Sequence, residues 1–277
     1  MAMGTDRHLR AVTYRRHDPV MSMKEDAVDG DQNLGRLRLY NVGMGLLHAV
    51  QGIAVVVLSN EFALPVTAAF MEGPPGSPAS TEELFTLPLG PAVAAFLFLS
   101  ALAHLLIAGP IWSWYRGHLL EGRSYARWIE YSVSSSLMIV LIAMITGIAD
   151  IAALVALFGV NASMILFGLL QEHYERPGRP GWLPFIFGSI AGIVPWIAIG
   201  IYLWSPGSAA EPPAFVYAIF VSLFVFFNSF AVNMILQYAR IGPWRDYLFG
   251  EYVYVALSLV AKSLLAWQVF ANTLVPS

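Results

Sequence analysis

Seven apolar stretches follow one another along the chain, separated by short segments that contain proline, glycine or charged residues. About 20 apolar residues are needed for a helix to cross the roughly 30 Å hydrocarbon layer of a membrane. Alternation of apolar and polar positions, which is typical of strands, is absent from these stretches, and a spanning segment must satisfy its own backbone hydrogen bonds. The pattern therefore predicts an all-α membrane protein, a single seven-helix bundle, with helices near residues 38–60, 88–115, 124–148, 150–171, 182–204, 213–239 and 248–274.

Composition supports a membrane protein. Hydrophobic residues make up 57% of the 277 residues and charged residues only 12%, and the mean hydropathy is +0.64. Soluble domains are less apolar and about twice as rich in charge. Cysteine is absent, which excludes disulfides and thiolate metal sites.

Basic residues lie on one side of the predicted bundle. Apart from Lys262, they occupy the N-terminal segment and the second, fourth and sixth connections, whereas the other connections carry only acidic charges. The positive-inside rule then predicts a cytoplasmic N-terminus and an extracellular C-terminus. This asymmetry indicates topology and lipid contact rather than nucleic-acid binding. The basic residues are Arg7, Arg10, Arg15, Arg16, Lys24, Arg36, Arg38, Arg116, Arg123, Arg127, Arg176, Arg179, Arg240 and Arg245.

The chain divides into a polar cytoplasmic N-terminal extension, residues 1–36, and the seven-helix bundle, residues 37–277. The extension lacks the apolar core of a cleavable signal peptide. The longest connection, residues 61–87, is predicted to be external. Two interpretations of this connection stay open. It has local order, such as a hairpin or a partner surface, or it is a mobile solvated loop, as its proline and glycine content also allows.

Four ionisable side chains lie inside apolar stretches: Lys262, Glu130, His48 and His104. At 1.5 Å per residue, Lys262 and the two histidines lie roughly 15–18 Å from the cytoplasmic ends of their helices, near the membrane midplane. Glu130 is shallower, and we expect it to reach toward Lys262 while Arg127 snorkels outward. Glu130 is interpreted as the only carboxylate within the membrane.

A desolvated lysine amine can attack an aldehyde and form a Schiff base, whose protonated form needs a counterion. Glu130 suits that role, and the hydroxyls of Ser134 and Ser258 each lie one turn from a charged neighbour. The alternative from the residues alone is an ion pair that only ties two helices together.

The chain resembles the heliorhodopsins. The resemblance is carried by Glu130-Tyr131 with Ser134, by the stretch Ser258 to Trp267 around Lys262, by His48, and by Ser100 with His104. It covers all seven predicted helices, and the predicted cytoplasmic N-terminus is opposite to that of ordinary microbial rhodopsins and animal opsins.

The resemblance implies a light-sensing photoreceptor with all-trans retinal bound covalently to Lys262 as a protonated Schiff base and Glu130 as counterion. His48, His104 and Gln237 would belong to a polar proton network. Photoisomerisation would drive Schiff-base deprotonation and a conformational signal to an unknown signalling partner. A homodimer, formed through the helices at 150–171 and 182–204, is also implied. The candidate retinal-contact positions are Ser100, Tyr131, Ser134, Asn161, Met164, Gly168, Trp196, Phe224, Phe227, Asn228 and Ser258.

Other functions fit the same residues less well. A proton pump needs acids on both sides of the chromophore, and the sequence places none inside a helix on the external side. A light-driven or secondary ion transporter using Lys262 and Glu130 is the main alternative. A zinc hydrolase would lack a third buried ligand, and a haem protein using His48 and His104 would leave Lys262 unexplained. We therefore expect no enzymatic activity and no bound metal.

Overall fold

The computed structural model describes residues 19–204 and 211–276, with side chains from residue 32 onward. The chain separates into two compact units, residues 1–36 and residues 37–277. Residues 1–18 of the expected N-terminal extension lie outside the described residues. The second unit forms the helical bundle.

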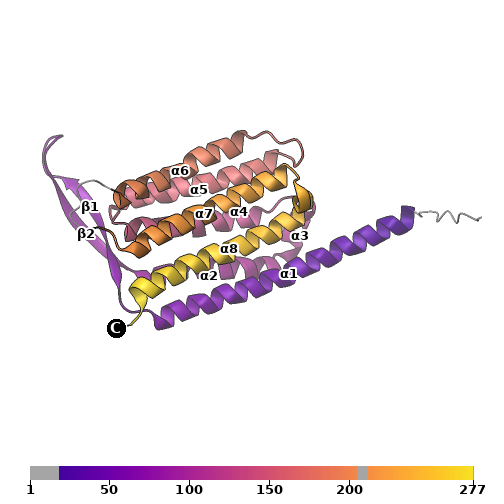
Figure 1. Cartoon of the computed structure of the whole chain (residues 1–277), viewed down its shortest axis with the longest axis horizontal. Helices are drawn as coiled ribbons and strands as arrows, with labels where there is room; N and C mark the ends of the chain where they lie inside the picture. Colours follow the sequence, from indigo (N-terminus) through magenta and orange to yellow (C-terminus); the bar gives the residue numbers. More distant parts are fainter. Residues whose placement is uncertain (1–18, 205–210, 277) are drawn as a thin grey trace, which may run out of the picture. The chain divides into compact units, whose positions relative to one another are not determined.

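In the described ranges, seven helices are long and apolar enough to cross a membrane, as the sequence predicted (Figure 1). Their ends agree with the predicted ends to within a few residues in most cases. They are α1 (Pro19–Leu58, apolar from Gln32), α2 (Leu89–Ala108), α4 (Tyr125–Ile145), α5 (Ile151–Tyr174), α6 (Leu183–Leu203), α7 (Ala214–Tyr238) and α8 (Tyr247–Val269), the last continued by a π-helical turn, η2 (Phe270–Leu274).

Two boundaries differ from the prediction. Helix α1 begins at Pro19 rather than near residue 38. The stretch 88–115 is not one helix, because α2 ends at Ala108 and a separate helix, α3 (Trp112–Leu120), follows. Pro110 has no amide hydrogen and restricts the residue before it, so the helix stops there. Arg38 donates from Nε to the carbonyl of Ala108 at 2.6 Å and stabilises the end of α2.

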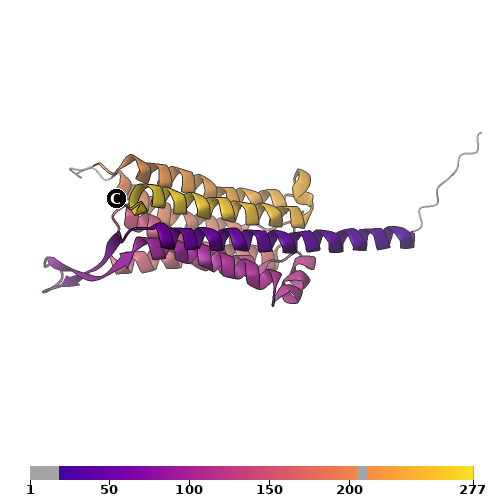
Figure 2. The ribbon, with the colours of Figure 1, turned by 90° about the horizontal axis from the view of Figure 1, so that it is seen from below.

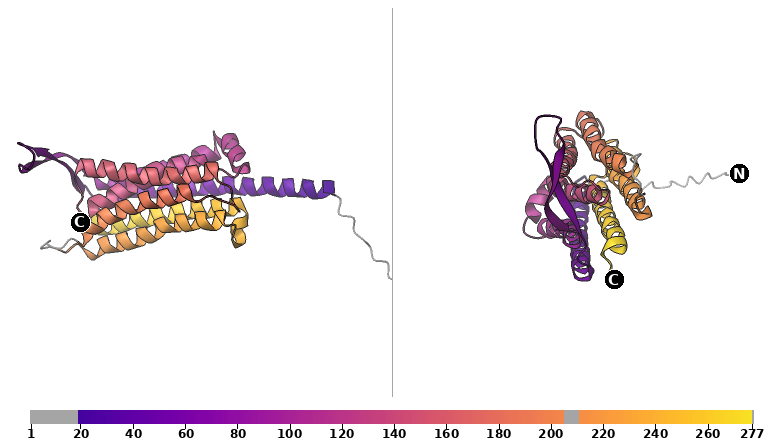
Figure 3. Two further views of the ribbon diagram at one scale, coloured as in Figure 1. Left: turned by 90° about the horizontal axis from the view of Figure 1, so that it is seen from above. Right: turned by 90° about the vertical axis from the view of Figure 1, so that its left-hand side faces the viewer.

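The helices pack mainly against sequence neighbours. Helix α5 lies between α4 and α6, α7 packs on α8, and α2 packs on α4 and α8 (Figure 3). Helix α4 is the most enclosed of the seven and carries two neighbouring core residues, Ile139 and Ile142. Close approach of α1 and α2 depends on Gly52, where a Cβ atom would lie 2.8 Å from the ring of Phe98.

The connection between α1 and α2 forms an antiparallel hairpin of β1 (Ala63–Met71) and β2 (Ala79–Pro88), so the hairpin interpretation is confirmed. Its turn uses Gly76 with φ +97°, a backbone conformation that favours glycine. The amide of Thr67 donates to the carbonyl of Ala149 at 2.9 Å, which ties the hairpin to the start of α5.

The hairpin projects from the end of the bundle at which the C-terminus lies (Figure 2). The amide of Asn60, just before β1, donates to the carbonyl of Leu274 at 2.9 Å. This end is called the hairpin end below. The opposite end, where α3 and the 3-10 helix η1 (Gly242–Arg245) lie, is called the far end.

Candidate functional site

Lys262 lies in α8 with only 3% of its surface exposed. Its Nζ donates to Oε1 of Glu130 and to Oγ of Ser258, both at 2.9 Å. Ser258 precedes Lys262 by one helical turn, so α8 supplies both the amine and one of its acceptors. Glu130 comes from α4, so the ion pair joins two helices through residues that are 132 positions apart in sequence.

Glu130 has a second partner, since Ser100 of α2 donates from Oγ to the same carboxylate oxygen at 2.6 Å. Ser134 is fully buried one turn further along α4. The ring centroid of Tyr131 lies 5.1 Å from the ammonium nitrogen of Lys262, close enough for a cation–π contact. The carboxylate thus has two donors, and the ammonium has two acceptors and an aromatic neighbour.

A cavity of about 190 Å³ opens beside the amine of Lys262 and is lined from α4, α5, α6, α7 and α8. This volume is far larger than a single water molecule needs. Its walls are mainly apolar and aromatic. Ten of the sequence-predicted contact residues line it: Lys262, Ser258, Tyr131, Ser134, Met164, Gly168, Trp196, Phe224, Phe227 and Asn228.

The aromatic side of the cavity is built around Trp196 of α6. Its ring lies 5.4 Å from each of Phe220, Phe224 and Phe227 in edge-to-face contacts. Edge-to-face geometry is favoured for aromatic pairs and contributes roughly 0.5–1.5 kcal/mol per pair beyond the buried area. The indole of Trp196 is buried, so the packing role and the cavity-lining role coincide at this residue.

Other predicted residues lie away from the cavity surface. Glu130 and Ser100 lie behind the amine. Asn161 of α5 donates from Nδ2 to the hydroxyls of Ser135 and Ser136, at 2.9 and 3.0 Å, and so supports α4 from behind the wall. Gln237 lies toward the far end and donates to the carbonyl of Tyr247. Among the described residues, no hydrogen bond joins Gln237 to His48 or His104, the other members of the predicted proton network.

His48 of α1 and His104 of α2 stack on each other with ring centroids 5.6 Å apart. Nδ1 of His104 lies 2.7 Å from Oδ1 of Asn41, a buried neighbour that the sequence interpretation missed. His104 lies one turn along α2 from Ser100, which donates to Glu130. The two histidines therefore form a second polar layer beside the ion pair.

Several wall residues escaped sequence analysis. Trp128 and Tyr254 are the largest of them, and Gly188, Ser189 and Gly192 supply a smooth face of α6. The repeated small residues of α6, at one-turn spacing, were the available signal. Others in this group are Ser135, Met138, Ile165, Phe185, Ile193, Phe230, Ala231, Met234 and Ala261.

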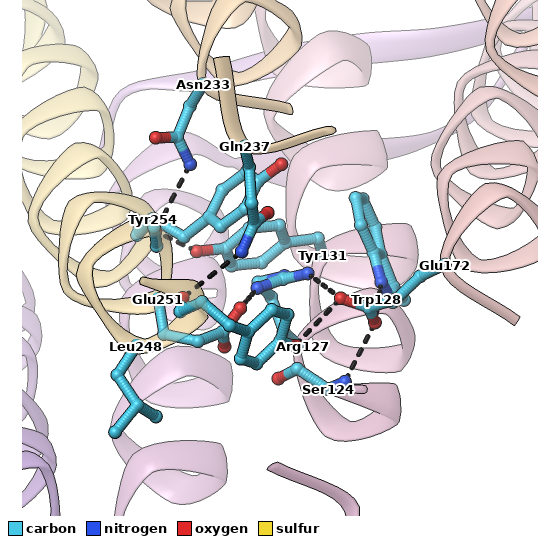
Figure 4. Close-up of polar contacts among 12 residues, drawn as sticks. Ser124, Arg127, Trp128, Tyr131, Glu172, Asn233, Gln237, Leu248, Glu251 and Tyr254 are labelled. Atoms are coloured by element: carbon cyan, nitrogen blue, oxygen red, sulfur yellow. Dashed lines mark hydrogen bonds and ion pairs between the residues drawn. The ribbon is translucent and has the colours of Figure 1, made fainter. Parts of the chain in front are cut away.

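A buried charge cluster of Arg127, Glu172 and Glu251 lies toward the far end (Figure 4). The exposed fractions of these residues are 7%, 3% and 1%. Arg127 donates from Nη2 to Glu172 at 2.8 Å and also pairs with Glu251. The expectation that Arg127 snorkels outward is wrong, because both carboxylates hold it inside the protein. Glu130 is likewise not the only buried carboxylate of the bundle.

Glu172 is the centre of this cluster. Its Oε2 accepts from the backbone amide of Ser124 at 2.8 Å and from Nε1 of Trp128 at 2.6 Å. Its Oε1 accepts from Arg127 and from the hydroxyl of Tyr247 at 2.9 Å. Four donors from α4, the residue before it and α8 therefore converge on one carboxylate of α5.

A search of curated proteins finds no match to the chain. The family model described as Heliorhodopsin matches residues 37–274, which include the lysine site, six of the seven apolar helices in full and α1 from Leu37 onward. Together with the buried lysine, its carboxylate partner and the adjoining cavity, this match shows that the chain belongs to the heliorhodopsin family of retinal-containing light-sensing membrane proteins.

Proposed function

We propose that Lys262 holds all-trans retinal as a protonated Schiff base, with Glu130 as its counterion, and that the protein is a photoreceptor rather than an enzyme or a pump. One observation carries the proposal: a buried amine at the wall of a large apolar cavity is paired 2.9 Å from a single carboxylate. An ion pair that served only to join α4 and α8 would need no such cavity beside it.

The residues fit retinal. A long polyene attached to Lys262 needs apolar walls, which Trp196, Phe224 and Phe227 provide. It also needs a polar end at the nitrogen, which Glu130 and Ser258 provide. When bound, retinal supplies absorption of visible light and a change of shape on isomerisation.

Each polar residue has a role that follows from its contacts. Glu130 neutralises positive charge on the nitrogen, since an unpaired charge in a bundle interior is strongly unfavourable. Ser100 orients Glu130 by donating to the oxygen that faces the amine. Ser258 offers a second acceptor for a proton on the nitrogen. His48 and His104 would accept or relay a proton that leaves this region.

Charge asymmetry supports a cytoplasmic far end and an external hairpin end. Arg116, Arg123, Arg176, Arg240 and Arg245 all belong to far-end segments. The N-terminus would then be cytoplasmic and the C-terminus extracellular. We also propose a homodimer through α5 and α6 and a separate signalling partner, both on the basis of the family resemblance.

The central test uses the visible spectrum of protein purified with all-trans retinal. We expect a visible absorption band that is lost in Lys262→Ala. The matched control is Lys24→Ala, because Lys24 is the only other lysine in the sequence. Absence of a band in the unchanged protein, or a band that survives Lys262→Ala, would overturn the proposal.

Two further measurements test the roles separately. Glu130→Gln removes the negative charge near the nitrogen, so the band is expected to move to longer wavelength and to respond to added anions. An unchanged spectrum would assign the counterion elsewhere. Light-driven pH changes in a cell suspension that vanish with a protonophore would show pumping and favour the transporter alternative.

A further inference from the structure

The cluster of Arg127, Glu172 and Glu251 has no part in holding a ligand on Lys262. Burying one cation with two carboxylates is costly, and replacing such groups by well-packed apolar residues is often neutral or stabilising. A buried charge cluster is therefore weak evidence for stability alone. The cluster joins α4, α5 and α8 at the far end, so it can control how these three helix ends move relative to one another.

Two residues belong both to the cavity wall and to the immediate surroundings of the cluster. Trp128 lines the cavity and donates its indole N–H to Glu172 at 2.6 Å. Tyr254 lines the cavity, and the guanidinium carbon of Arg127 lies 3.9 Å from its ring centroid. The rings of Trp128 and Tyr254 also meet edge to face, with centroids 6.0 Å apart. The cluster and the cavity thus share one aromatic wall.

Trp128 has little freedom on its outer side. A Cβ atom at Gly168 of α5 would lie only 2.5 Å from its ring, so the indole is packed directly on the α5 backbone. Protein interiors are close-packed and transmit displacement rather than absorb it. A ligand that changes shape against Trp128 would therefore displace α5 or pull the indole N–H away from Glu172.

The cluster also holds the far-end starts of two helices. Glu172 accepts from the amide of Ser124, directly before α4, and from the hydroxyl of Tyr247, the first residue of α8. Loss of the carboxylate contacts would release both helix starts from the end of α5. The adjoining connections, residues 121–124 and 239–246, lie where a partner could detect the change.

We propose that Arg127, Glu172 and Glu251 form a latch that a shape change in the cavity opens through Trp128. In the dark the latch holds the far ends of α4, α5 and α8 together. Displacement of Trp128 weakens the hold on Glu172 and lets the end of α5 move away from α4. This inference rests on the proposed function, because light acts through the ligand on Lys262.

The test is a light-dependent distance measurement across the latch. The chain has no cysteine, so two can be introduced without background. Glu121, beside the start of α4, and Arg176, just beyond α5, are both exposed and suit nitroxide labels as Glu121→Cys and Arg176→Cys. Pulsed electron–electron double resonance then measures the distance between the labels in the dark and under illumination.

We expect illumination to shift the distance in the otherwise unchanged protein. Trp128→Phe keeps an aromatic ring but loses the N–H, and the light-induced shift should be lost when variant and unchanged protein are compared at equal retinal occupancy. The matched control is Trp244→Phe, which removes an equally short indole hydrogen bond, 2.6 Å to Asn233, outside the latch. The control should keep the full shift.

A second variant avoids the cavity altogether. Tyr247→Phe removes one donor to Glu172, and Tyr247 does not line the cavity. It should broaden the distance distribution in the dark, even in protein without retinal, and reduce the light-induced shift. This measurement remains decisive if Trp128→Phe fails to fold.

The outcomes separate the two proposals. No visible band in the unchanged protein refutes the retinal site. A normal band with no distance shift on illumination refutes the latch alone. A shift that persists in both Trp128→Phe and Tyr247→Phe also refutes the latch and leaves the retinal site intact.

Discussion

Glu172→Gln should show how much the far-end cluster contributes to the free energy of unfolding. The side chain keeps its shape and loses its charge, and one carboxylate oxygen becomes an amide NH₂. Arg127 still has Glu251 as a partner, so no isolated charge is created. The effect therefore measures the loss of the Glu172 hydrogen bonds and of its charge beside Arg127, without leaving Arg127 unpaired.

The contacts of Glu172 leave the new amide with no good orientation. If its nitrogen replaces Oε2, it faces the N–H groups of Ser124 and Trp128. If it replaces Oε1, it faces the guanidinium of Arg127, although the hydroxyl of Tyr247 can turn to accept. Each buried donor left unsatisfied costs about 1–3 kcal/mol. Two such donors give an expected destabilisation of roughly 2–6 kcal/mol.

The assay is thermal unfolding of the purified protein in detergent, with and without retinal. At about 2–4 °C per kcal/mol for a chain of this order of size, the midpoint should fall by roughly 5 °C or more. The control is Glu121→Gln, which removes an exposed ion pair of 3.4 Å to Arg123. Surface pairs contribute about 0–1 kcal/mol. If the unfolding midpoint falls equally in both variants, the cluster does not hold the far ends of α4, α5 and α8 together.

Three further predictions concern other parts of the bundle. Burial raises the pKa of Tyr115 from about 10 to about 12. Because the unfolded chain loses this proton first, the free energy of unfolding should fall between pH 10 and 12 by at most about 3 kcal/mol. Tyr115→Phe should flatten that part of a curve of stability against pH. Gly168→Ala places a methyl against Trp128 and should destabilise by about 1–3 kcal/mol in thermal unfolding, whereas Gly159→Ala, on the same helix and facing open space, should not. Asp150→Ala removes the side chain that caps the first turn of α5 and should lower the free energy of unfolding by about 0.5–2 kcal/mol. Asp150→Asn keeps a capping oxygen and should retain most of that stability. Equal stability of the two variants would refute the capping role.

The helices could be predicted because the membrane imposes a simple rule on sequence. A spanning segment must be continuous and apolar, so the ends of α5, α6 and α7 follow from the nearest proline, glycine or charge. The break between α2 and α3 was missed because the residues around Pro110 are as apolar as those inside the helix. Hydropathy alone does not register a missing amide hydrogen.

The meeting of Lys262 with Glu130 was also predictable, since charges inside a bundle need partners and few were available. The cavity walls from α5 and α6 were harder to predict. An apolar residue that lines a cavity and one that faces lipid have the same sequence signature. Only the fold distinguishes Ile165, which lines the cavity, from Leu166 beside it, which is 43% exposed.

Arg127 shows why counting depth along one helix can mislead. It lies two residues into α4, and an arginine so near a helix end is normally expected to snorkel to the interface. Its partners come from α5 and α8, 45 and 124 residues later in the chain. Long-range pairing of this kind leaves no local pattern, because each member alone resembles an ordinary interfacial charge.

The two buried charge sites differ in a way that bears on function. At Lys262 one cation meets one carboxylate, and a Schiff base would preserve that balance. At Arg127 one cation meets two carboxylates, and the excess negative charge depends on hydrogen-bond donors for its stability. Trp128 is one of those donors and also a cavity wall. A ligand that moves this ring therefore also changes the hydrogen bonding of the less balanced of the two sites.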